Sequence, residues 1–128
     1  MKSTSLVLEW VLGGPLMAGA LLSGTVAQAH AHLQTAIPAD GSVISAPPAT
    51  IVLGFSEPAR LTAVWIQKDG GAKQKVGSLP SEPARRISVA MPHLAPGSYV
   101  VSWRVVGQDS HVVRGRIRFT LSDRRARN

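Results

Sequence analysis

Apolar residues alternate with polar ones in short runs along most of this chain, and this alternation constrains the fold more than any other feature. In one such run, Ile51, Leu53 and Phe55 are separated by single residues. A repeat of two places these side chains on one face of a β-strand, whereas a helix requires apolar residues three and four positions apart. No segment after residue 30 shows the helical repeat. The sequence therefore predicts an all-β fold.

Proline and glycine divide these runs into candidate strands. Proline fixes φ and lacks an N–H, and glycine adopts positive φ, so both turn the chain. Such separators include Pro38–Ser42, Glu57-Pro58 and Asp69–Gly71, the last being the strongest hairpin signal. About seven short strands with regular turns predict an antiparallel sandwich of two sheets. The candidate strands are Leu33–Ile37, Thr50–Phe55, Thr62–Lys68, Lys73–Val76, Arg86–Met91, Gly97–Val106 and Val113–Ser122.

The N-terminal part of the chain has the character of an export signal. No charged residue occurs from Trp10 to Ala29, and Lys2 supplies a basic start. Ala27 and Ala29 are small residues at the two positions that an exporting peptidase reads. We predict cleavage after Ala29. An uncleaved membrane anchor is the alternative, because about 20 apolar residues can span a bilayer.

The chain is therefore predicted to consist of a cleaved signal peptide (1–29), one folded domain (30–122) and a basic C-terminal tail (123–128). The chain has no cysteine, so a disulfide, a thiolate metal site and a thiol nucleophile are all excluded. The formal charge of +7 predicts a soluble basic surface, or one attracted to anionic lipid headgroups or an acidic partner. No nucleic-acid partner is expected for an exported chain.

Cleavage after Ala29 would leave His30 with a free α-amine beside its imidazole, and those two nitrogens can chelate one metal ion. Far downstream, Asp109 and His111 offer an oxygen and a third nitrogen. Residues two apart in an extended chain point to the same side, so both side chains are expected to face one ion. Three nitrogens and one oxygen in a tetragonal arrangement favour Cu(II), although zinc is chemically compatible. We therefore predict His30, Asp109 and His111 as metal ligands, with no catalytic residue.

Each of these residues also has an ordinary structural interpretation. Asp109 would satisfy nearby backbone amides in a turn, and His111 would be a turn histidine with local hydrogen bonds. His32 is a competing ligand, because it would occupy the third position of the processed chain. There it can bind Cu(II) with the terminal amine and two deprotonated amides, a mode that excludes His111. His93 is predicted to lie in a surface loop.

Several longer stretches match a known family in order and spacing. They resemble the CopC-type periplasmic copper-resistance domains over nearly all of the chain after the leader. The matching stretches are His30–Leu33, Pro38–Ser42, Phe55–Pro58, Pro96–Val106, Asp109–His111 and Gly115–Phe119.

This resemblance implies a seven-stranded immunoglobulin-like, Greek-key sandwich that binds one Cu(II) ion in the periplasm. The family's N-terminal histidine falls on His30, and its Asp-x-His pair falls on Asp109 and His111. The methionine-rich loop that holds Cu(I) in some members is missing from this sequence, which implies a Cu(II)-only member. The implied role is copper resistance or homeostasis, holding copper or delivering it to a CopD-type inner-membrane protein.

Two other functions compete with this one. A terminal-histidine copper centre also resembles that of copper-dependent polysaccharide monooxygenases, and a metal-free sandwich could serve as an interaction module. Most aromatic residues after the leader fall at expected core positions, which leaves little for a sugar-binding platform. We therefore expect a monomeric copper-binding protein that is not an enzyme and has no carbohydrate substrate.

Overall fold

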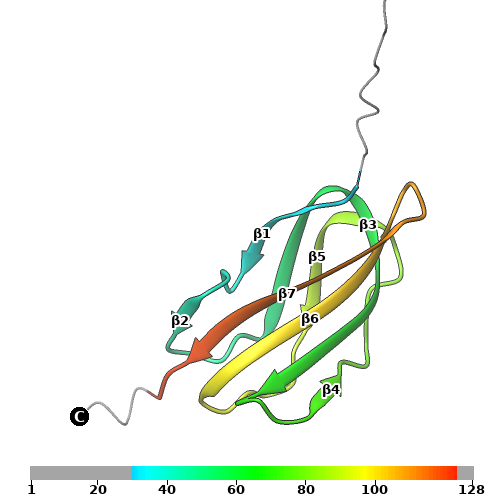
Figure 1. Cartoon of the computed structure of the whole chain (residues 1–128). Coiled ribbons are helices and arrows are strands. Elements are labelled where there is room, and N and C mark those ends of the chain that lie inside the picture. Colours follow the sequence, from blue (N-terminus) through cyan, green and yellow to red (C-terminus); the bar gives the residue numbers. More distant parts are fainter. Residues whose placement is uncertain (1–29, 124–128) are drawn as a thin grey trace, which may run out of the picture.

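The computed structural model describes residues 30–123, so the predicted signal peptide and residues 124–128 of the predicted tail lie outside the described part. This part contains seven strands and no helix, and hence no helix that could cross a membrane (Figure 1). The strands are β1 (Leu33–Ile37), β2 (Ser42–Ile44), β3 (Thr50–Lys68), β4 (Lys73–Lys75), β5 (Ala84–Ala90), β6 (Gly97–Gly107) and β7 (Val112–Leu121).

The long strand β3 belongs to both layers of the fold. Its first part, Thr50–Gly54, pairs with β1 and β5, whereas its second part, Ala59–Lys68, pairs with β6. Strand β4 also pairs with this second part, at residues 65–67. Strand β6 pairs with β7, and β7 with β2. One layer is therefore β1-β3-β5, and the larger one is β4-β3-β6-β7-β2. This arrangement confirms the predicted all-β sandwich.

The hydrophobic core lies between the two layers and includes Ile51, Leu53 and Phe55, the run whose alternation predicts one buried face. Burying one large aliphatic or aromatic side chain stabilises a fold by about 1.5–3 kcal/mol. Within the described residues 30–123, the core extends from Ala31 to Leu121 and draws side chains from both layers. Its largest fully buried side chains are Ile51, Leu53, Val64, Val89, Val101, Val105 and Ile117.

Two details of the predicted strand pattern are wrong. Glu57-Pro58 does not separate two strands, because Thr50–Phe55 and Thr62–Lys68 are both parts of β3. The ladder between β3 and β5 is interrupted from Gly54 to Ala59. Pro58 lies inside this interruption, where the missing N–H of proline removes no bond to β5.

The second error concerns β2, which the sequence does not predict and which makes the sandwich not wholly antiparallel. Ser42–Ile44 pairs in parallel with Phe119–Leu121. A strand of three residues is too short to show an alternation. The Asp69–Gly71 hairpin is confirmed, since it connects β3 to β4 with positive φ at Asp69 (49°) and Gly70 (73°).

Candidate metal centre

The first described residues lie along the bend of β3. Ala31 is completely buried there. The backbone N–H of His32 donates to Oγ of Ser56 over 2.9 Å, and the N–H of Ser56 donates to the carbonyl of His32 over 2.8 Å. The Ser56 hydroxyl also donates to the carbonyl of His30 over 3.4 Å. These contacts fix the position of His30 at one end of the sandwich.

A tight turn between β6 and β7 holds Asp109 and His111. Ser110 has a φ of 66°, and its N–H donates to the carbonyl of Gly107 over 3.0 Å. Oδ1 of Asp109 accepts the backbone N–H of His111 over 3.1 Å. The expectation of an extended Asp-x-His segment is therefore wrong, because this turn brings the two side chains to one side. The turn-forming role expected of Asp109 is present at the same time.

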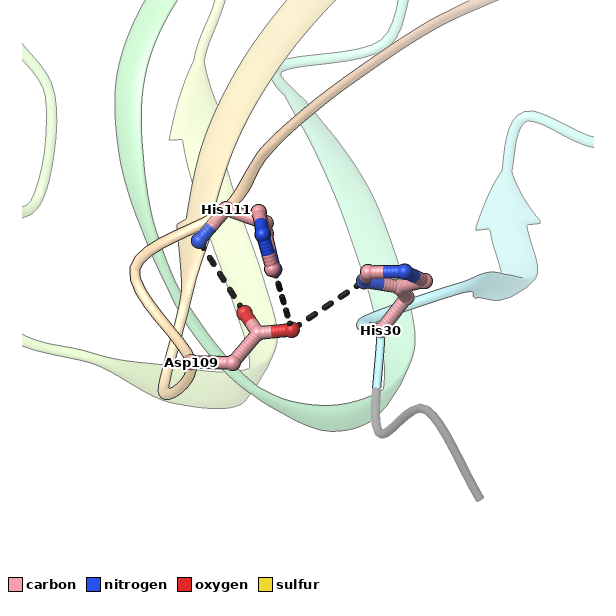
Figure 2. Close-up of side chains that lie close together, drawn as sticks. All are labelled: His30, Asp109 and His111. Atoms are coloured by element: carbon pink, nitrogen blue, oxygen red, sulfur yellow. Dashed lines mark hydrogen bonds and ion pairs between the residues drawn. The ribbon is translucent and has the colours of Figure 1, made fainter. Parts of the chain in front are cut away.

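The three predicted ligands meet at one point (Figure 2). Oδ2 of Asp109 lies 3.1 Å from Nδ1 of His30 and 2.9 Å from Nδ1 of His111. The two imidazole rings have centroids 5.1 Å apart and are inclined by 74°. One donor atom from each residue lies within 4.8 Å of the others, a spacing at which a single ion can contact all three after small side-chain movements.

The carboxylate of this group is held in its charged form. Hydrogen bonds from the ring and the backbone N–H of His111 lower the pKa of Asp109 to about 2. The side chain of His111 is 68% exposed and that of His30 is 29% exposed. The centre is therefore an ionised oxygen between two imidazoles at the protein surface, within reach of an incoming cation.

The other two histidines are not part of this group. His32 is exposed, and its ring centroid lies 6.4 Å from that of His30, at the edge of the same shallow depression. His93 is exposed in the connection between β5 and β6, as predicted.

Two residues that shape the centre, Ser56 and Gly107, have no role predicted from the sequence. Ser56 lies within Phe55–Pro58, a stretch noted only for its resemblance to a family. A β-carbon at Gly107 would lie 3.0 Å from Oδ1 of Asp109 and 3.9 Å from Cβ of Ala31. Nothing in the local sequence distinguishes Gly107 from any other glycine after a strand, because its closeness to the carboxylate of Asp109 depends on the geometry of the turn.

Comparison with known proteins gives consistent matches. Residues 33–122 match the family model of the CopC domain. Copper resistance protein C of Xanthomonas campestris pv. juglandis is 34% identical over 116 residues, covering 83% of this chain and 91% of that protein. Protein YobA of Escherichia coli K12 is 29% identical over 126 residues, covering 94% of this chain and 99% of that protein. The crystal structure of CopC from Methylosinus trichosporium OB3b superposes with a TM-score of 0.65 at 28% identity, covering 74% of this chain and 96% of that one.

Proposed function

This chain belongs to the CopC domain family, and we propose that it binds one Cu(II) ion through His30, Asp109 and His111 after export and removal of residues 1–29. Relatives that carry the name copper resistance protein C support copper as the cargo. The observation that carries the proposal is the position of one carboxylate oxygen between the Nδ1 atoms of two histidines. These histidines are far apart in the sequence of the domain and adjacent in its structure.

The donor set fits Cu(II) better than Cu(I). Imidazole, amine and carboxylate groups suit Cu(II), whereas thiolate and thioether sulfur select Cu(I). The chain has no cysteine, and Met91 is the one methionine after the leader. Met91 is not among the residues of the metal centre. The ligands that the domain offers therefore support a site for oxidised copper.

The fold also prepares this site before the metal arrives. The carboxylate of Asp109 holds both imidazoles toward a common point, and the turn and the bend of β3 fix their backbones. Ordering ligands in advance reduces the entropy lost on binding. A free amine on His30 would add the fourth donor, which makes removal of the leader part of assembling the site.

The competing mode through His32 conflicts with the fold. It requires the amide nitrogen of His32 to lose its proton and bind the ion. In the folded domain that N–H donates to Ser56. Binding through the terminal peptide alone would break this bond, which supports the centre shared with His111.

We assign the domain a role in holding or delivering copper in the periplasm, with a CopD-type inner-membrane protein as recipient. The exposed ring of His111 is accessible to a partner that accepts the ion.

A polysaccharide monooxygenase is the second candidate function, and the positions of the aromatic residues do not favour it. Phe55, Tyr99, Trp103 and Phe119 are buried in the core, and the guanidinium of Arg104 lies over the ring of Trp65 at 5.5 Å. No flat aromatic surface is left for a sugar in residues 30–123.

Calorimetric titration with Cu(II) tests the proposal on the chain 30–128. We expect one ion per chain, and affinity at least about tenfold weaker when a glycine is added before His30 or when His111→Ala is introduced. His93→Ala is the matched control, since it removes an exposed histidine outside the group. If the added glycine left the affinity unchanged, the terminal amine would not be a ligand. If His111→Ala had no effect, the terminal peptide with His32 would be the binding site. The intact mass of the exported protein tests whether His30 is its first residue.

A further inference from the structure

The outer surface of the larger sheet carries most of the positive charge of the described chain. Residues that pair directly across antiparallel strands share one face of a sheet. Lys75 pairs with Trp65, Trp65 with Ser102, and Ser102 with Arg116. These four residues therefore form one row across β4, β3, β6 and β7 on the side away from the core.

Neighbouring rows repeat this pattern. Val100 is paired with Arg118 on one side and with Gln67 on the other, and Gln67 is paired with Lys73. Arg104 is half-buried and directly opposite Arg114. We call this surface the basic face. Besides Arg104, its cations are the exposed residues Arg60, Lys73, Lys75, Arg114, Arg116 and Arg118.

The charge of the basic face is not neutralised within the described part of the domain. No aspartate or glutamate occupies a paired position on it, and none of its cations forms an ion pair with an acidic residue of the range 30–123. One carboxylate lies at its edge, where Oδ1 of Asp40 accepts the backbone N–H of Arg118 over 2.8 Å. Arg104 and Arg114 stand directly opposite each other, an arrangement that destabilises a sheet. The guanidinium of Arg104 stacks over Trp65 and donates to Oγ1 of Thr62, and neither partner carries a negative charge.

The outer surface of the smaller layer is different. Val52 is paired with Ile37 and Ser88 there, and Arg86 is the one cation at its paired positions. The two remaining cations of the described chain, Lys68 and Arg85, lie outside the basic face. A general excess of basic residues would not produce this difference between two sheets of one domain.

We propose that the basic face docks on the anionic headgroups of a phospholipid bilayer. Cations on alternate residues of β7 are about 7 Å apart, and those on neighbouring strands about 5 Å apart, so they spread over an extended surface. Basic surfaces of this kind are attracted to anionic leaflets. Trp65 and the 53% exposed Val112 lie among them. Tryptophan and short apolar side chains suit the boundary between headgroups and acyl chains.

The docked orientation would place the metal centre beside the bilayer. Val112 and Arg114 belong to the basic face, and they line the same depression as His30 and His111. A copper ion would then be released next to a membrane protein rather than into the bulk periplasm. This consequence rests on the proposed copper function, whereas lipid binding itself does not.

Co-sedimentation with vesicles tests the proposal on the chain 30–128. We expect binding to vesicles of phosphatidylcholine and phosphatidylglycerol in a 3:1 ratio, little binding to phosphatidylcholine alone, and release by high salt. The triple change Arg114→Gln, Arg116→Gln, Arg118→Gln should weaken binding at least about tenfold. The matched control Lys68→Gln, Arg85→Gln, Arg86→Gln removes the same charge elsewhere and should change binding less than about threefold.

A second measurement needs no substitution on the basic face. Bound anionic vesicles should shift the fluorescence of half-buried Trp65 to shorter wavelength. The same shift should occur in Trp103→Phe, which leaves Trp65 as the one tryptophan of the chain 30–128. Equal loss of binding in both triple variants would overturn the proposal, as would binding to neutral vesicles or no binding at all. The last result would favour an acidic protein as partner. His111→Ala should bind vesicles normally, so failure of copper binding and failure of lipid binding are distinguishable.

Discussion

His32 and Ser56 form hydrogen bonds with each other in both directions. The N–H of His32 donates to Oγ of Ser56 over 2.9 Å, and the N–H of Ser56 donates to the carbonyl of His32 over 2.8 Å. This pair ties the beginning of the domain to the bend of β3. A Cu(II) ion bound by the terminal peptide alone would take the amide nitrogen of His32 away from Ser56. The fold and that binding mode therefore compete for one nitrogen atom.

The competition predicts opposite effects of Ser56→Ala in two backgrounds. With His111 present, the substitution loosens the N-terminal segment, so Cu(II) affinity should fall. In the His111→Ala background it frees the amide of His32, so the residual Cu(II) affinity should rise. Calorimetry measures both, and electron paramagnetic resonance shows whether more nitrogen donors surround the ion. Ser88→Ala, an exposed serine on the smaller layer, is the control. A change of the same sign in both backgrounds would contradict the competition.

A second prediction concerns Gly107, which leaves room for the carboxylate of Asp109. A β-carbon at this position would lie 3.0 Å from Oδ1 of Asp109, which accepts the backbone N–H of His111. Gly107→Ala should therefore displace the carboxylate and weaken Cu(II) binding by about tenfold, the effect typical of a supporting residue at a metal site. Gly77→Ala is the control, because an added carbon there meets nothing within 4 Å. If Gly107→Ala bound copper as tightly as Gly77→Ala, the glycine would not be needed to hold the carboxylate of Asp109 in its binding position.

Much of the fold follows from sequence because its signals are local. The parity of Ile51, Leu53 and Phe55 fixes one buried face, and Asp69–Gly71 forms the predicted hairpin. The unbroken β3 could not be predicted, since Pro58 is acceptable in a strand only where its neighbour is missing, and that depends on the register with β5. Strand β2 depends likewise on its parallel partner, β7.

The candidate site shows the same division. Its three side chains are predictable from the chemistry of a processed N-terminus and an Asp-x-His pair. Their geometry is not, because it depends on a positive φ at Ser110 and on contacts of Ala31 and Ser56 with distant segments. Groups that bind a metal are therefore easier to predict from a sequence than the residues that hold them in place.

The low pKa of Asp109 predicts how pH acts on the centre. Hydrogen bonds from His111 lower this pKa to about 2, from an ordinary value of about 3.9. The folded state thus favours the ionised carboxylate, so its contribution to stability is complete above about pH 4 and is lost as pH falls to about 2. Between about pH 4 and 8 the carboxylate stays charged, so its own protonation should not release copper in this range.

A pH titration of Asp109→Asn checks this assignment. The variant should bind Cu(II) more weakly at every pH above 4, and the midpoint of copper release should stay the same. In the metal-free state, its urea midpoint should lose the decrease between about pH 4 and 2 that Asp109 contributes to the unmodified chain. A shifted release midpoint would mean that the carboxylate itself titrates in the range where copper leaves.

A further prediction concerns the stability of the fold, which depends on the close packing of Trp103 on Gly115. These residues pair across β6 and β7, and a β-carbon at 115 would lie 2.2 Å from Cζ2 of Trp103. The indole has little room to move, since its ring packs edge-on against Phe55 at 5.2 Å and is nearly buried. Overpacking of this kind costs about 1–3 kcal/mol, so Gly115→Ala should lower the urea midpoint. Gly77→Ala should leave the urea midpoint unchanged, because no atom lies near the added carbon.

Gly115 is not among the residues of the metal centre. A saturating amount of Cu(II) should therefore stabilise Gly115→Ala and the unmodified chain by the same increment. A smaller increment in the variant would show that the packing of Trp103 is coupled to the copper site through β6.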